Sequence, residues 1–382
     1  MIKNVSIITA SSFVAMFFLG VGSAVIGAAS KNIGLTPHQI GLLIAVQNLG
    51  FILSVIVSGS LADTFSKTIL LSWTSFILSI SFFFFYAKDA LLFNFLVMLC
   101  IGIGIGGYEG VADTLLLEIH DQRESLFITV NHFFATSGGL LITVYLVFLQ
   151  MDWRKSLLQS AAIVFVLTLV FAFSRTASNR LKSDSFRVRL GFLFRQRPVM
   201  TLFILASCAT GIELATIGIL TSFLMDLRDF DQVTSKIGLI IFISGIACGR
   251  LLLGFITGKD RLVDTIALLF GLTALCSGVL YFIRLGNGAT YLMLFITGAT
   301  ISALFPLIIT FAGIKYSAAK GMILGMVKLG VPAGGMLVPF FISVVTKYGP
   351  FELSLGLFPL IGMIGFWLLL INRKELQSSA TH

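Results

Sequence analysis

Long apolar stretches dominate the sequence, and the short segments between them hold most of the charged residues. A helix needs about 20 apolar residues to cross the roughly 30 Å hydrocarbon core of a bilayer. Twelve stretches have lengths of that order, namely residues 5–29, 39–62, 68–87, 91–117, 125–149, 157–173, 199–224, 237–257, 262–283, 291–314, 322–345 and 353–371. The pattern therefore predicts an all-α integral membrane protein with twelve transmembrane helices.

Composition supports a membrane protein. Of the 382 residues, 57% are hydrophobic and 11% are charged, whereas soluble domains are about 25% charged. This balance excludes soluble enzymes, disordered tails and nucleic-acid binders. The apolar stretch 5–29 exceeds the roughly 7 to 15 residues of a signal-peptide core, so we expect it to be the first transmembrane helix.

The distribution of basic residues predicts the topology. With an even number of spans, both termini lie on one side of the membrane. If that side is the cytoplasm, 16 of the 26 Lys and Arg fall in cytoplasmic segments and eight fall outside. The positive-inside rule therefore predicts cytoplasmic termini and a multi-pass protein of the plasma (inner) membrane.

A basic loop divides the spans into two sets of six. Residues 174–198 form the longest loop and carry seven Lys and Arg. The loop after the second span, from Gly59 to Lys67, is similar in sequence to the loop after the eighth span, from Gly254 to Arg261, as expected of two homologous halves. We therefore expect three parts: an N-terminal six-helix bundle, residues 1–173; a cytoplasmic linker, 174–198; and a C-terminal six-helix bundle with a short tail, 199–382.

The loop between the second and third spans resembles the signature of the major facilitator superfamily. The residues that match are Gly59, Leu61, Asp63, Lys67 and Leu71. The resemblance implies two pseudo-symmetric bundles around a central cavity, with substrate bound near the midplane. A small residue allows close helix approach, and an aspartate can bond a neighbouring helix end or base. Gly59, Asp63 and Lys67 are therefore candidates for conformational gating.

Further motifs resemble the fucose, galactose and glucose proton symporters of that superfamily. The fourth span is glycine-rich and carries Glu109, followed four residues later by Asp113 where that family has asparagine. The other matching motifs are Gly211-Ile-Glu213, Gly249-Arg250, Phe305-Pro306 and Gly334-Gly335 through Pro339. The first span lacks the acidic residue of that family. The resemblance implies sugar transport coupled to protons.

Ionisable residues inside a bilayer are costly, so those deep in the spans are candidates for function. Three acids, Glu109, Asp113 and Glu213, are the predicted proton carriers. Glu109 and Asp113 share one helix face, and two carboxylates so close should not both stay ionised. The candidates for substrate binding are Arg250, Lys328, Gln47, Asn48, Tyr108, Asn131 and His132. Pairing of Arg250 or Lys328 with Asp113 or Glu213, in a purely structural polar network, is the alternative.

The sequence gives no support for a nucleotide-binding or metal-binding motif. Gly102, Gly104 and Gly107 have dinucleotide-fingerprint spacing, but they lie within a transmembrane stretch and predict a helix-packing face. The chain has no Gly-Lys-Ser/Thr loop for ATP, and its four cysteines lie in apolar runs without metal-ligand spacing. We expect no cofactor, no metal and no enzymatic activity.

The sequence thus favours a secondary active transporter that works by alternating access as a monomer in the lipid bilayer, with a small, sugar-like solute and protons as its partners. An exporter of amphipathic compounds or an organic-anion carrier of the same fold is the alternative, in keeping with the Phe-rich spans, Arg250 and Lys328. A membrane receptor or scaffold that does not transport is the alternative from a different class, although it would gain nothing from intramembrane charges.

Overall fold

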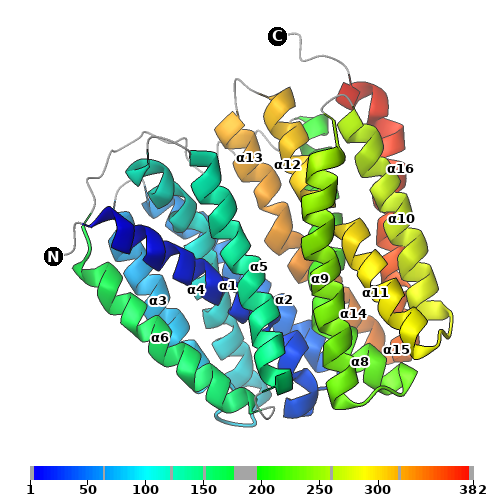
Figure 1. Cartoon of the computed structure of the whole chain (residues 1–382), viewed down its shortest axis with the longest axis horizontal. Helices are drawn as coiled ribbons and strands as arrows, with labels where there is room; N and C mark the ends of the chain where they lie inside the picture. Colours follow the sequence, from blue (N-terminus) through cyan, green and yellow to red (C-terminus); the bar gives the residue numbers. More distant parts are fainter. Residues whose placement is uncertain are drawn as a thin grey trace. The chain divides into compact units, whose positions relative to one another are not determined.

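The computed structural model is helical throughout the part of the chain that it describes, which is residues 4–62, 65–120, 124–148, 152–175, 196–258, 261–316 and 320–377 (Figure 1). Within these residues, twelve segments are long and apolar enough to cross a membrane. The predicted fold class, an all-α membrane protein with twelve spans, is therefore confirmed.

The first six spans are single helices. They are α1 (Val5–Ile33), α2 (Pro37–Leu61), α3 (Lys67–Phe84), α4 (Leu91–Ile119), α5 (Glu124–Phe148) and α6 (Trp153–Phe173). Three more single-helix spans follow, which are α8 (Arg197–Arg228), α9 (Gln232–Ile256) and α10 (Leu262–Phe282).

Each of the last three spans is broken into two helices. The pairs are α11 (Asn287–Ser302) with α12 (Leu304–Lys315), α13 (Lys320–Lys328) with α14 (Gly330–Tyr348), and α15 (Phe351–Leu355) with α16 (Leu357–Gln377). The sequence predicted uninterrupted stretches here, because apolar length alone does not register a local break.

Prolines explain these breaks. The breaks fall at Ala303, Leu329 and Gly356, three residues before Pro306, Pro332 and Pro359 respectively. A proline has no backbone N–H, so the carbonyl four residues earlier receives no helical hydrogen bond, and the proline ring crowds that carbonyl. The three spans are therefore interrupted within the turn that precedes Pro306, Pro332 and Pro359, whereas α14 continues through Pro339.

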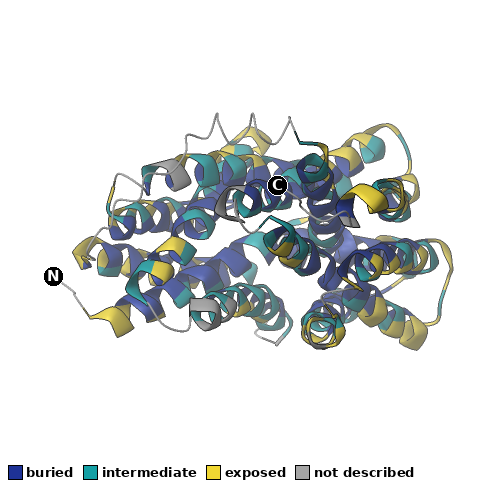
Figure 2. Cartoon of the chain, turned by 90° about the horizontal axis from the view of Figure 1, so that it is seen from above, coloured by how far each residue is buried: buried dark blue, intermediate teal, exposed yellow. Residues whose placement is uncertain are grey.

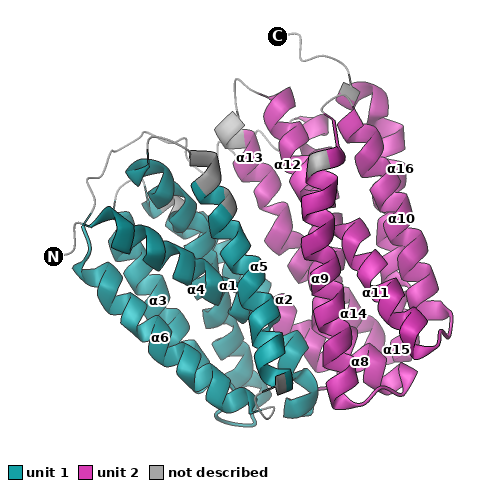
Figure 3. Cartoon of the chain, viewed as in Figure 1, with its two compact units in different colours: residues 1–34, 46–186 teal, residues 35–45, 187–382 magenta. Residues whose placement is uncertain are grey.

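The chain forms two compact units (Figure 3). Unit 1 comprises residues 1–34 and 46–186, and unit 2 comprises residues 35–45 and 187–382. The beginning of α2 belongs to unit 2, where it packs against α14. A Cβ atom added to Gly41 would lie 2.4 Å from the backbone oxygen of Pro339, and His38 Nδ1 lies 2.7 Å from Ser343 Oγ. The remainder of α2 belongs to unit 1.

Glycines allow close helix packing within unit 1. A Cβ atom on Gly102 would lie 1.9 Å from the backbone oxygen of Gln47 in α2, and one on Gly107 would lie 2.0 Å from Thr74 Cγ2 in α3. Neither separation is tolerated by a real side chain. The glycine-rich part of α4 is therefore a helix-packing face, as the sequence predicted. Buried residues gather where helices meet within each unit (Figure 2).

Acidic side chains cap two helices at their N-termini. Asp152 accepts from the backbone N–H of Lys155 at the start of α6. At the start of α9, Asp231 accepts from the backbone N–H groups of Val233 and Thr234. The bond from the Thr234 backbone is the main reason that the pKa of Asp231 is lowered. These caps satisfy N–H groups that lack a helical partner.

Candidate functional site

Glu213 and Arg250 form an ion pair in unit 2. Glu213 lies about halfway along α8 and Arg250 lies in the last two turns of α9. Arg250 Nη2 donates to Glu213 Oε1 over 2.7 Å, and 34% of the arginine side chain and 14% of the glutamate side chain are exposed. The carboxylate therefore has a countercharge within the span, so that neither group stands alone in the apolar layer.

A backbone carbonyl fixes the same guanidinium from a second side. Arg250 Nε donates over 3.2 Å to the carbonyl oxygen of Ser302, the last residue of α11. That carbonyl would normally accept the N–H of residue 306, which is proline and has none. Pro306 thus leaves an acceptor inside the span, and Arg250 uses it. Arginine suits this position because its planar fork presents donors in fixed directions.

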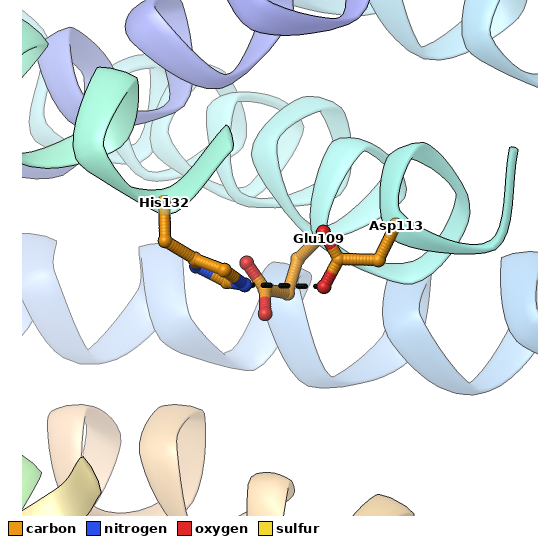
Figure 4. A group of neighbouring side chains, drawn as sticks. All are labelled: Glu109, Asp113 and His132. Carbon is orange, nitrogen blue, oxygen red and sulfur yellow. Dashed lines mark hydrogen bonds and ion pairs between the residues drawn. The ribbon is translucent and has the colours of Figure 1, made fainter. Parts of the chain in front are cut away.

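A second polar cluster lies in unit 1, between α4 and α5. Asp113 Oδ1 accepts from Asn131 Nδ2 over 2.9 Å, and Asp113 Oδ2 lies 3.1 Å from His132 Nε2. Glu109 lies one helical turn before Asp113 and points into the same space as His132 (Figure 4). The prediction that Glu109 and Asp113 share a helix face agrees with this arrangement, and Asn131 and His132 join them from α5.

Three other candidates are engaged in the interior of unit 1. Tyr108 is completely buried, and its hydroxyl donates to Ser75 Oγ over 2.8 Å. Gln47 donates to the backbone oxygen of Gly22 over 2.7 Å, and Asn48 is buried as well. These two hydrogen bonds of Tyr108 and Gln47 join helices within the bundle and are not made to the acidic cluster.

The signature loop is only partly within the described residues. Gly59 lies in the last turn of α2, whereas Asp63 lies outside the described residues. Lys67, the first residue of α3, forms an ion pair with Glu118 at the end of α4. The two side chains are 8% and 13% exposed. Glu118 was not among the predicted site residues, because the predicted span 91–117 stops one residue before it.

Of the two intramembrane cations, Arg250 pairs with Glu213, which was one of the alternatives drawn from the sequence. Lys328 is the last residue of α13, four residues before Pro332. Ser302 was missed altogether, because a backbone acceptor has no signal in the sequence except the proline four residues later.

The unit 1 cluster also has the composition of a metal site. One ligand atom each from Glu109, Asp113 and His132 lie within 4.8 Å of one another. Spacing along the sequence predicted no metal, because these residues lie on two different helices. In the described part of the chain, this is the one group of three or more histidine, cysteine or acidic side chains that lie that close together.

Comparison with solved structures identifies transporters with the same fold. A bacterial homolog of the human lysosomal transporter Spinster, in an inward-facing and unoccupied conformation, has a TM-score of 0.78 and 14% identity, over 97% of each chain. The nucleoside transporter NupG has a TM-score of 0.75 and 16% identity, over 97% of this chain and 100% of that chain. A D-xylose-proton symporter has a TM-score of 0.76 and 13% identity, over 95% and 96%.

These identities are too low to transfer a substrate, so the likeness shows the fold. Comparison with curated proteins gave no match. The sequence model of the Major Facilitator Superfamily matches residues 8–320, which is most of the chain. Together with the transporter neighbours, this match indicates a transporter rather than an enzyme. The chain is a multi-pass membrane protein that belongs to the Major Facilitator Superfamily.

Proposed function

We propose that this protein is a proton-coupled secondary active transporter that moves a small, sugar-like solute across the plasma (inner) membrane by alternating access. The excess of basic residues in alternate loops supports cytoplasmic termini, with residues 174–198 as a cytoplasmic linker between bundles 1–173 and 199–382. The motifs at Glu109, Glu213 and Arg250 support a relation to the fucose, galactose and glucose symporters.

The ion pair between Glu213 and Arg250 carries the proposal. Burying charges within a span costs roughly 2.5–3.5 kcal/mol for each residue on insertion scales, so a purely structural role is better served by apolar side chains. A proton that binds Glu213 removes the countercharge of Arg250 and releases its Nη2 donor. The guanidinium is then available to a solute hydroxyl or carboxylate. Proton binding and solute binding are coupled in this way through one side chain.

The resemblance to the fucose, galactose and glucose symporters, carried by the motifs at Glu109, Glu213 and Arg250, supports a sugar-like solute. The exposed third of the Arg250 side chain favours a second candidate, an organic-anion carrier, because a guanidinium binds carboxylates in a bidentate manner.

Gly59, Asp63 and Lys67 are proposed to control the rate of exchange between conformations and not the affinity for the solute.

A ligand screen tests the substrate class. Purified protein is heated with D-xylose, D-glucose, D-galactose, uridine, organic acids and lipophilic cations, because a ligand that binds the native state raises the melting temperature. We expect a sugar or nucleoside to stabilise the protein and to support counterflow in proteoliposomes. Stabilisation by organic acids alone would replace the sugar proposal with the anion carrier, and stabilisation by lipophilic cations alone would favour an exporter.

A further inference from the structure

The polar cluster of unit 1 has the spacing of a coordination site. Glu109, Asp113 and His132 each place a ligand atom within 4.8 Å of the others, and Asp113 Oδ2 lies 3.1 Å from His132 Nε2. Ligands that share a first-row metal ion at about 2.1 Å lie roughly 3 to 4 Å from one another. Small rotamer changes therefore suffice to bring all three groups onto one ion.

Asn131 is a fourth polar side chain at the cluster. Its side chain is completely buried, and its Oδ1 has no hydrogen-bond partner among the described residues. The amide lies against the cluster, because Nδ2 of the same group is 2.9 Å from Asp113 Oδ1. A half-turn of the amide places Oδ1 where Nδ2 now lies, at a normal separation for two ligands of one ion. In that orientation Oδ1 is available to a cation, and Nδ2 takes the position that Oδ1 occupies in the structure.

Charge and exposure fit the same conclusion. Two carboxylates lie on consecutive turns of α4, and Glu109 makes no hydrogen bond or ion pair with another described residue. A divalent ion compensates two negative charges within a span. The His132 side chain is 41% exposed and that of Asp113 is 13% exposed, so the cluster is not sealed inside the bundle.

The mixture of ligands identifies the class of ion. Carboxylate and amide oxygens suit hard cations, whereas an imidazole nitrogen suits zinc and other first-row transition metals and is a poor ligand for sodium or magnesium. We propose that Glu109, Asp113, Asn131 and His132 bind a divalent first-row transition metal ion and thereby tie α4 to α5. This site is separate from the pair of Glu213 and Arg250, and the inference does not depend on proton coupling there.

Metal titration of the purified, tag-free protein tests the proposal. The protein is first treated with a chelator and then titrated with Mn²⁺, Co²⁺ or Zn²⁺, by calorimetry and by the visible absorption of Co²⁺, which changes when nitrogen replaces water as a ligand. We expect one ion for each chain and a higher melting temperature with the ion bound. Glu109→Gln and His132→Gln should each weaken binding at least about tenfold.

The matched control is His38→Gln, which removes a histidine of α2 that bonds Ser343 and should leave metal affinity unchanged. Asn131→Asp keeps the size of the side chain, adds a charged ligand and should tighten binding, which provides a test even if another variant fails to fold. The proposal is overturned if no saturable binding occurs, if the cluster variants bind as the wild type does, or if Na⁺ stabilises the protein as much as Mn²⁺. None of these readouts requires transport.

Discussion

Arg250 connects Glu213 to Ser302: its Nη2 lies 2.7 Å from the carboxylate of Glu213, and its Nε lies 3.2 Å from the backbone oxygen of Ser302. One planar group therefore links α8, α9 and the end of α11 within unit 2. Both contacts depend on the direction of the donors as well as on the positive charge.

Arg250→Lys keeps the charge but cannot satisfy both acceptors with a planar fork. We expect solute counterflow in proteoliposomes to fall at least about tenfold, which corresponds to ~1.4 kcal/mol. Arg284→Lys, which changes an exposed loop arginine, is the control and should transport normally. Wild-type counterflow in Arg250→Lys would show that charge alone is sufficient.

Pro306→Ala supplies the N–H that the Ser302 carbonyl lacks. The new helical hydrogen bond should compete with Arg250 Nε, so we expect slower counterflow together with an unchanged or higher melting temperature. Pro359→Ala is matched to it, because Pro359 also lies three residues after a break but its freed carbonyl, that of Leu355, accepts no side chain within the described residues. Equal effects of the two variants on transport would contradict the role assigned to Ser302.

Gly102→Ala tests the packing of α4 against α2. The added methyl group would lie 1.9 Å from the backbone oxygen of Gln47, so the helices must separate, at a cost of about 1–3 kcal/mol. We expect a lower melting temperature. Gly278→Ala, where a Cβ atom meets nothing within 4 Å, should be neutral or slightly stabilising because alanine favours a helix. Similar melting temperatures for both variants would contradict the close packing.

The ion pair of Lys67 and Glu118 can be tested by a double-mutant cycle. Removing one partner leaves the other charge buried, which costs about 3–5 kcal/mol for a buried pair. We therefore expect Lys67→Met and Glu118→Met each to destabilise the protein more than the double variant does, as measured by the melting temperature. Additive losses in the double variant would show that the two residues act independently.

The transmembrane architecture was predictable because a span needs only apolar length. The breaks at Ala303, Leu329 and Gly356 were not predicted, since a hydropathy average takes no account of one missing N–H, although each proline was visible in the sequence. The shared face of Glu109 and Asp113 followed from helical periodicity alone.

The partners of these acids were not predictable in the same way. The contact of Asp113 with His132 depends on the register of α4 against α5, and the contact of Glu213 with Arg250 depends on how α8 meets α9. One sequence by itself does not specify how α4 aligns with α5 or how α8 aligns with α9. Asp113, His132, Glu213 and Arg250 were nevertheless all predicted as site residues, because charged and polar side chains are rare within spans.

The most direct test of the central claim is the transport of a stabilising solute by Glu213→Gln in proteoliposomes, with and without a pH gradient. Glutamine mimics the protonated carboxyl and carries no titratable proton. If Glu213 carries the proton, this variant should retain binding and solute exchange at equal pH but lose accumulation driven by the gradient. Gradient-driven accumulation at the wild-type level in Glu213→Gln would contradict the account.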